Sequence, residues 1–343
     1  MKRILGFLFV WWLVAACGQQ PTPTPDLVAT QVAVMQAAAA TLTAAAPAAT
    51  STPVPAASST PIPVPSATAA PTRAPSPTPT APPLVTELPP PIGPGLGRFA
   101  VVNVADDDQL NVRARPGVAY AIVGTIPYHG MDVEVHAGGQ EVAGSWWVPV
   151  QYGDLVGWAN NNYLARQVGW VDEAIAARAA QAVMALKERD LEKLAGLVHP
   201  HKGVRFSPYT FVQVEPDAPG GQDLAFGADR IPGLLADTTI YHWGVYDGSG
   251  EPIDLTFQEY YDRFIYDADF ARPDVVGFDE EVGWSSMINN IAEVYPQAVT
   301  VEYHFEGFEP QYAGMDWRSL RLVLEEQGGV WYLVGIVHDE WTT

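Results

Sequence analysis

The sequence predicts a multidomain protein in which a small all-β barrel is followed by an α+β domain, with helices packed on a curved and mostly antiparallel sheet. Three observations lead to this prediction. Proline is concentrated in the first 96 residues, short apolar–polar alternations follow up to residue 167, and helical spacing and then longer strand patterns fill the remainder. The charge divides in the same way, because residues 168–343 carry 11 basic and 30 acidic side chains of a chain whose net charge is −21.

This composition argues against several functions. A surface this acidic repels phosphate groups at long range, so we expect no nucleic-acid partner. Cys17 is the only cysteine, and the regions that follow it therefore contain no disulfide, no thiolate metal site and no cysteine nucleophile. The chain also lacks a His-Glu-x-x-His motif, a phosphate loop and a Gly-x-Ser-x-Gly motif. We therefore predict no metal and no cofactor, and no catalytic residue can be named.

Residues 1–16 have the form of a secretory signal. Lys2 and Arg3 precede an apolar run over residues 4–14, which is too short for a stable transmembrane helix. The sequence VAAC at residues 14–17 resembles the lipobox of bacterial lipoproteins, in which the cysteine is diacylated on sulfur and becomes the first mature residue. The resemblance implies a signal peptide at 1–16 and a lipid anchor on Cys17. It also implies an extracytoplasmic protein held at the membrane and exposed to the cell wall or cell surface.

Residues 17–96 are predicted to form a disordered tether. They are rich in Ala, Thr, Ser and Pro and have few large apolar side chains, so they cannot build a core. Residues 26–46 differ, because Asp26 can cap an alanine-rich helix that ends before Pro47. The proline-rich remainder, in a polyproline II conformation, would reach on the order of 150 Å and lift the next domain into the envelope.

Residues 97–167 are predicted to form the small barrel. Short alternating segments separated by Gly and Asp or Asn turns indicate strands at 99–104, 110–113, 121–126, 132–136, 146–151 and 155–160. The sequence LNVRARPG at residues 110–117, with Val123-Gly124, Trp147-Val148 and Gly157-Trp158 after it, resembles bacterial SH3 domains. The resemblance implies that peptidoglycan peptides or another envelope polymer bind in a groove between loops.

Candidate residues for that groove are aromatic and basic: Arg113, Arg115, Tyr120, Trp146, Trp158 and Tyr163. A structural interpretation stays open beside this one. In it Trp147 and Trp158 belong to the core, and the arginines pair with the aspartates at 106–108. A barrel of this size has no room for a ligand inside, so any function lies on its surface.

Residues 168–343 are predicted to form the α+β domain. Helices are expected over about 175–186 and 190–197, and Thr256 with Glu259 makes a capping box for a helix to about residue 266. Strands are expected at 210–214, 239–246, 299–308, 320–325 and 330–337, the last two joined through residues 327–329. The opening ALKERDLEKLAGLVHP and the closing GGVWYLVGIVHDEW resemble the nuclear transport factor 2-like cone, in which a curved sheet wraps against N-terminal helices. The segments GVRFSPY, YHWGVYDGSG, YDADF and DWRSL resemble a domain of secreted bacterial lipoproteins that has no assigned activity.

The basic stretch HPHKGVRFSPY at residues 199–209 supplies most of the candidate ligand-pocket residues in this domain: His199, His201, Lys202, Arg205, Tyr209 and, from a later strand, Trp243. Three interpretations stay open. The basic groups pair with nearby carboxylates, or Arg205 forms a fork for an anionic ligand, or a histidine acts as a catalytic base.

The sequence as a whole favours a lipid-anchored binding protein. Its barrel binds cell-wall material, and its last domain binds a ligand or partner that the sequence does not identify. The alternative is a wall-active hydrolase that uses carboxylates or histidines of the last domain. Thirty acidic residues bring pairs of carboxylates together by chance, so they do not point to a catalytic site. The oligomeric state is also not determined by the sequence.

Overall fold

The computed structural model describes residues 93–342. The predicted signal peptide, the anchor on Cys17, the tether and the helix at 26–46 lie outside these residues. Residues 93–342 belong to one compact unit, and they form a mixed sheet with few helices. Among the helices of this part of the chain, none has both the length and the apolar character needed to cross a membrane.

The first strands are short and surround a small core of their own. They are β1 (Gly95–Val101), β2 (Gln109–Arg113), β3 (Ile122–Pro127), β4 (Val133–His136), β5 (Gln140–Val142), β6 (Ser145–Tyr152) and β7 (Leu155–Asn160), followed by the 3₁₀ helix η1 (Asn161–Tyr163). Their inward side chains, among them Val112, Ile126 and Val133, are fully buried. Each of the six expected strands overlaps an observed one, whereas β5 was not predicted. We call residues 95–163 the small-core segment.

The remaining elements are longer and more varied. They are β8 (Leu164–Gly169), α2 (Glu173–Glu188), α3 (Leu191–Ala195), β9 (Val204–Ser207), β10 (Leu224–Phe226), η2 (Ile231–Ala236), β11 (Tyr241–Val245), β12 (Pro252–Leu255), α4 (Phe257–Tyr260), the π-helical turn η3 (Tyr261–Ile265), β13 (Val275–Phe278), α5 (Ile291–Val294), β14 (Val299–Phe305), η4 (Pro310–Tyr312), β15 (Arg318–Gln327) and β16 (Val330–Glu340). Both predicted opening helices are present, as are the predicted strands from residue 299 onward.

One sheet connects both groups of strands. Its order is β10-β9-β16-β15-β14-β13-β8-β1-β4-β6-β7-β2-β3, and β11 pairs with β12 in a separate ribbon. Strand β8 is the link, because it pairs with β1 on one side and with β13 on the other. Only the β8–β13 and β9–β16 pairs of the described residues are parallel, so the sheet is mostly antiparallel. The sequence predicted such a sheet for residues 168–343 beside a separate barrel, whereas one sheet includes strands of both regions.

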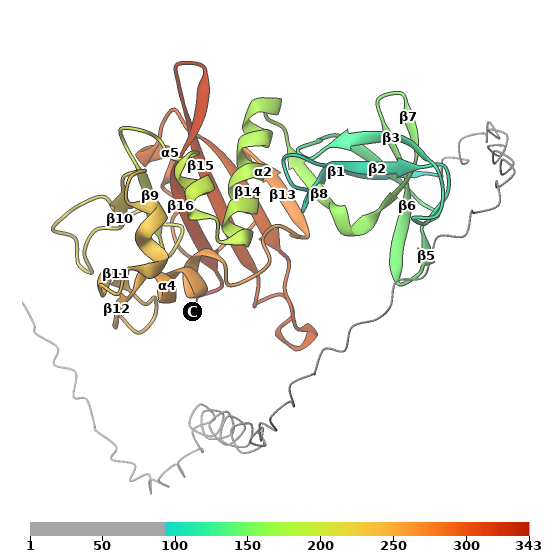
Figure 1. Ribbon diagram of the computed structural model, residues 1–343. Helices are drawn as coiled ribbons and strands as arrows, with labels where there is room; N and C mark the ends of the chain where they lie inside the picture. Colours follow the sequence, from blue (N-terminus) through green and yellow to red (C-terminus); the bar gives the residue numbers. More distant parts are fainter. Residues whose placement is uncertain (1–92, 343) are drawn as a thin grey trace, which may run out of the picture. The chain divides into compact units, whose positions relative to one another are not determined.

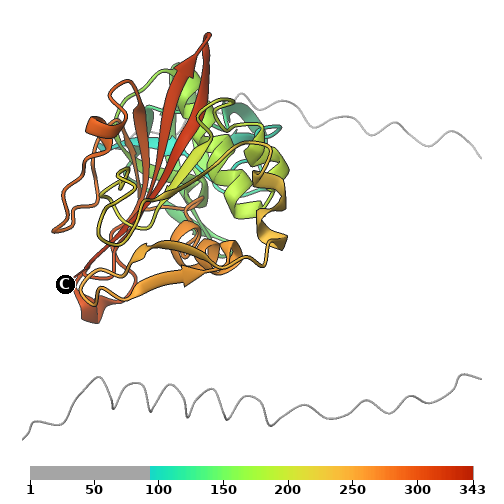
Figure 2. The same cartoon turned by 90° about the vertical axis from the view of Figure 1, so that its left-hand side faces the viewer.

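The larger core lies between this sheet and the helices. Helix α2 places Ile175, Ala179, Val183 and Leu186 at helical spacing, all of them buried, and it contacts β14, β15 and β16 (Figure 1). The β15–β16 hairpin reaches past its neighbours (Figure 2). Its turn contains Gly328 and Gly329 at φ of 65° and 83°, which confirms the predicted connection.

Two expectations about local structure need correction. No strand forms at 210–214, because the amide of Val212 donates to Asn290 Oδ1 (2.7 Å) and that of Gln213 donates to Asp223 Oδ2 (2.8 Å) instead of to a neighbouring strand. The helix predicted to run to residue 266 does begin at Thr256 with both bonds of its capping box, but α4 ends at Tyr260 and a π-helical turn follows.

Candidate functional site

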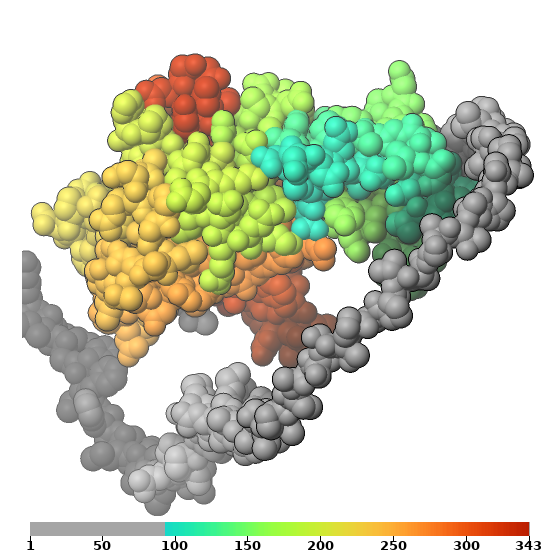
Figure 3. All heavy atoms as spheres, in the orientation of Figure 1, coloured from blue at the N-terminus to red at the C-terminus, as the bar shows by residue number. Residues whose placement is uncertain are grey.

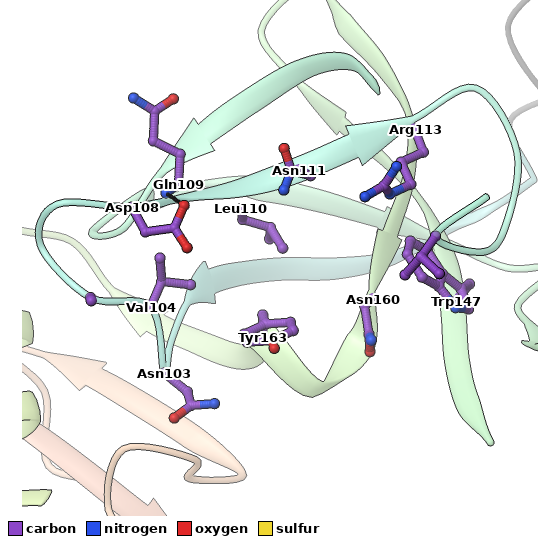
Figure 4. A pocket seen from close by; sticks show the side chains of 12 residues that line it. Asn103, Val104, Asp108, Gln109, Leu110, Asn111, Arg113, Trp147, Asn160 and Tyr163 are labelled. Carbon is purple, nitrogen blue, oxygen red and sulfur yellow. Dashed lines mark hydrogen bonds between the residues drawn. The ribbon is translucent and has the colours of Figure 1, made fainter. Parts of the chain in front are cut away.

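A surface cavity of about 310 Å³ lies on the small-core segment (Figure 4). Its lining comes from the loop between β1 and β2, from β2, from the start of β6, from the end of β7 and from η1. The polar and aromatic members are Asn103, Asp108, Gln109, Asn111, Arg113, Trp147, Asn160 and Tyr163. Figure 4 shows Arg113 and Trp147 at one end and Asn103 and Asp108 at the other. We call this cavity the amide groove.

The amide groove carries little net charge. Arg113 is the cation at one end, and its Nη1 donates to the carbonyl oxygen of Tyr120 (2.7 Å). Asp108 is the anion at the other end, where its carboxylate accepts from the amide of Gln109 (2.7 Å). Between them, the carboxamides of Asn111 and Asn160 can each donate and accept hydrogen bonds. Such a lining suits an uncharged polar chain, such as a peptide or a sugar that carries an acetamido group.

Lysines from two helices hold the loop that forms one end of the groove. Lys187 of α2 donates to Asn103 Oδ1 (2.7 Å), and Lys193 of α3 pairs with Asp106 (2.8 Å). The hydrogen bond from Lys193 lowers the pKa of Asp106, so the pair stays ionised at neutral pH. Asp106, one of the aspartates that the structural interpretation paired with the arginines, thus forms its ion pair with Lys193.

The predicted groove residues are divided by the fold. Arg113 and Tyr163 line the amide groove, whereas Trp158 is buried beside Arg113 in the β2–β7 pair. Tyr120 and Trp146 are exposed outside the cavity. Arg115 lies over the Tyr120 ring, with its guanidinium carbon 6.0 Å from the ring centroid.

Sequence reasoning missed the carboxamides of this cavity. Asn103, Asn111 and Asn160 are ordinary turn and strand-end residues in the sequence, and their types carried no signal. The one available hint was Asn111, which belongs to the LNVRARPG motif at 110–117. Trp147, interpreted as a core residue, is buried and forms part of the lining as well.

The basic stretch at 199–209 does not gather into one pocket. Lys202 pairs with Glu325, which is the ion-pair interpretation of the sequence. His199 is buried, and its Nδ1 accepts from the amides of His201 (3.2 Å) and Lys202 (3.0 Å). Burial and then the charge of Lys202 lower the pKa of His199, which keeps the ring neutral and able to accept. Arg205 Nη1 donates to the backbone carbonyl of Asp223 (2.5 Å).

These candidates border two different cavities. Lys202 and Arg205 line one of about 850 Å³, between β9 and the segment around α5. Tyr209 and Trp243 line another of about 300 Å³, together with Asp223. His199 and His201 line neither of them. The six residues thus do not line a single cavity.

A buried charge network crosses the centre of the sheet. The Arg321 side chain is 1% exposed, and its Nε donates to Glu302 (3.0 Å) while its Nη1 donates to Asp339 (2.8 Å) and to Thr210 (2.8 Å). Its Nη2 donates to the carbonyl of Gly283 (2.7 Å). Burial raises the pKa of Asp339, against the opposing charge of Arg321. Each guanidinium nitrogen therefore has a partner, as buried charges require.

Ser319 and His304 extend this network. The Ser319 hydroxyl lies 2.8 Å from His304 Nδ1 and donates to Glu302 Oε1 (2.5 Å). In a catalytic triad the carboxylate would orient the imidazole, whereas here it contacts the hydroxyl. Ser319 is also fully buried. Substrate has no access to it, and the arrangement is one that stabilises the sheet.

One set of side chains has the composition of a metal site. Ligand atoms of Asp267, His338 and Glu340 lie within 4.8 Å of one another. Two arginines contact the same carboxylates: Arg318 Nε lies 2.9 Å from Asp267, and Arg263 pairs with Glu340. Since the guanidinium groups already balance both carboxylates, the set serves as an ion-pair cluster in this structure.

The candidate ligand-binding sites in the described residues are therefore surface cavities. No family model, no curated protein and no solved structure matches this chain. The assignment of a function accordingly depends on the chemistry of those cavities.

Proposed function

We propose that the protein is a lipid-anchored, extracytoplasmic binding protein that holds peptidoglycan or another envelope polymer in the amide groove. The observation that carries this proposal is the groove itself, a surface cavity of about 310 Å³ lined by carboxamides and by the aromatic side chains of Trp147 and Tyr163. Peptide and acetamido groups each present an N–H and a C=O, which carboxamide side chains can satisfy in pairs.

The surrounding fold supports an SH3-type barrel in this role. Short strands around a fully packed core leave only the surface for a ligand, and the groove lies where the β1–β2 loop meets β6 and β7. A cavity of this size accommodates only a few polar groups, so each contact is weak. Binding to a polymer then gains strength from many equivalent sites along it.

The double variant Asn111→Ala with Tyr163→Phe is expected to lose about thirtyfold in affinity for purified wall sacculi. Each substitution removes one side-chain hydrogen-bonding group from the groove and keeps the backbone fold, and each such bond contributes about 1 kcal/mol. Co-sedimentation of the full mature chain with sacculi is the measurement.

Asn162→Ala is the matched control, because Asn162 is an exposed amide of the same 3₁₀ helix as Tyr163 that does not line the groove. It should bind as the wild type does. Equal recovery of the double variant and the control would refute the proposed groove.

The location is tested at Cys17. In cells, Cys17→Ser should move the protein from the membrane fraction to the soluble fraction, because the acyl chains that hold it are attached to that sulfur. Fractionation followed by immunoblotting measures the change. A Cys17→Ser protein that remains with the membrane after a high-salt wash would rule out a lipid anchor at this residue.

A further inference from the structure

Five carboxylate side chains in the described residues are buried: Asp223, Glu302, Glu325, Asp339 and Glu340. Four of them form ion pairs. Glu302 and Asp339 pair with Arg321, Glu325 pairs with Lys202, and Glu340 pairs with Arg263 and Arg318. Asp223 is 5% exposed and has no ion-pair partner within residues 93–342. Buried carboxylates are rarely left without a cation, so Asp223 is the exception that needs a reason.

The contacts of Asp223 explain how it is held in place without being neutralised. Its Oδ2 accepts from the amide of Gln213 (2.8 Å), and its own amide donates to the carbonyl of Gln213 (3.0 Å). The nearby cation, Arg205, donates to the backbone carbonyl of Asp223 (2.5 Å). Burial raises the pKa of Asp223 to about 7, and the Ser207 hydroxyl, the hydrogen bond from the Gln213 amide and the charge of Arg205 offset this only in part.

Asp223 lines the cavity of about 300 Å³ that lies between the loop after β9 and the β11–β12 ribbon. The walls are largely aromatic and apolar: Tyr209, Phe211, Trp243, Val245, Tyr246 and Met287. The loops that rim it, coloured yellow in Figure 3, lie at the surface. Aromatic faces attract cations through their quadrupoles, so both the walls and the carboxylate favour a positive group.

Trp243, which lines the cavity, packs against a second aromatic ring. The Trp243 and Tyr260 rings stack with their centroids 3.8 Å apart and an interplanar angle of 16°. The Tyr260 hydroxyl is buried and has no hydrogen-bond partner in the described residues. Asp223 is close to it, since burial and then the charge of Asp223 raise the pKa of Tyr260. Tyr260 does not line the cavity, so the oxygen-bearing group that a ligand with several N–H donors would meet there is the Asp223 carboxylate.

We propose that this cavity binds a protonated primary amine carried on a short apolar or aromatic group, with Asp223 as its counter-ion. A ligand of this kind replaces the missing cation and packs its apolar part against the aromatic walls. The same features disfavour an anion, which would face a buried carboxylate. This proposal goes beyond the proposed function, and it does not depend on the amide groove.

The test uses 2-phenylethylamine and its neutral counterpart 2-phenylethanol as probes, titrated calorimetrically into the full mature chain at pH 8. The amine should bind at least tenfold more tightly than the alcohol. Asp223→Asn keeps an acceptor for the Gln213 amide and should remove this preference. Asp247→Asn changes an exposed acidic residue on the rim of the same cavity and should keep it.

A second variant checks the location independently of the charge. Met287→Trp enlarges a side chain that lines the cavity and should prevent binding of both probes. Equal binding of amine and alcohol to the wild type would overturn the proposal, as would a preference that survives Asp223→Asn or is lost equally in Asp247→Asn. Absence of binding at millimolar amine would overturn it too. Sacculus binding is unaffected by any of these outcomes, so failure here is distinguishable from failure of the amide groove.

Discussion

Replacing Arg321 by methionine is expected to destabilise the protein by about 3–5 kcal/mol, which is the effect of removing one partner from a buried ion pair. The change leaves Glu302 and Asp339, 0% and 1% exposed, without the guanidinium that both contact. It also frees the hydroxyl of Thr210 and the carbonyl of Gly283. The measurement is urea unfolding at pH 7, followed by tryptophan fluorescence.

Arg166→Met is the matched control. Arg166 pairs with Glu306 at 2.6 Å, but both side chains are more than half exposed. An exposed pair contributes about 0–1 kcal/mol. If the two variants unfold at similar urea concentrations, the network around Arg321 does not hold the sheet together in the way described. A triple variant that also carries Glu302→Gln and Asp339→Asn should recover part of the loss, because it removes the stranded charges.

The second large effect is a pH dependence that originates at Asp223. The pKa of its carboxyl is about 7 in the folded protein, compared with the ordinary aspartate value of 3.8 that applies to the unfolded chain. Between these values the folded state retains a proton that the unfolded state has released, so stability decreases as pH rises through this window. Below pH 3.8 Asp223 is protonated in both states, and the stability that the protonated carboxyl allows is fully present. Above about pH 7 the carboxyl is ionised in both states, and this stability is lost. A difference of about 3 pKa units corresponds to about 4 kcal/mol.

Asp223→Asn removes this titration. At pH 8 the variant should be more stable than the wild type by up to about 4 kcal/mol, and the difference should shrink toward zero near pH 4. Urea unfolding of both proteins between pH 4 and pH 8 measures it, and the other titrating groups cancel in the comparison. A constant difference across this range would contradict the assignment of the effect to Asp223.

Much of the secondary structure could be predicted, because its signals are local. The capping box at Thr256 and Glu259, the glycines of the β15–β16 turn and the helical spacing in α2 each act within a few residues. Strands such as β10, β12 and β13 were missed because three or four residues are too few to show an alternation.

The chemistry of the cavities could not be predicted, because it depends on contacts between distant segments. Arg321 follows Leu320 in an alternating strand and therefore looks exposed, yet both faces of β15 are covered and the side chain is 1% exposed. Asp223 follows two glycines and a glutamine in what looks like a solvated turn. It is buried because it contacts Gln213, ten residues earlier, and because it lies next to the β11–β12 ribbon.

The double pairing of β8 also determines how the molecule bears mechanical load. A pull on the chain that precedes β1 acts along that strand, which is hydrogen-bonded to β4 on one side and to β8 on the other. The hydrogen bonds on both sides of β1 are then loaded together in shear. They do not break one after another, as they would if an edge strand were pulled away from the sheet. Since β8 is bonded in turn to β13, tension entering at Gly95 spreads across the sheet to strands nearly two hundred residues away.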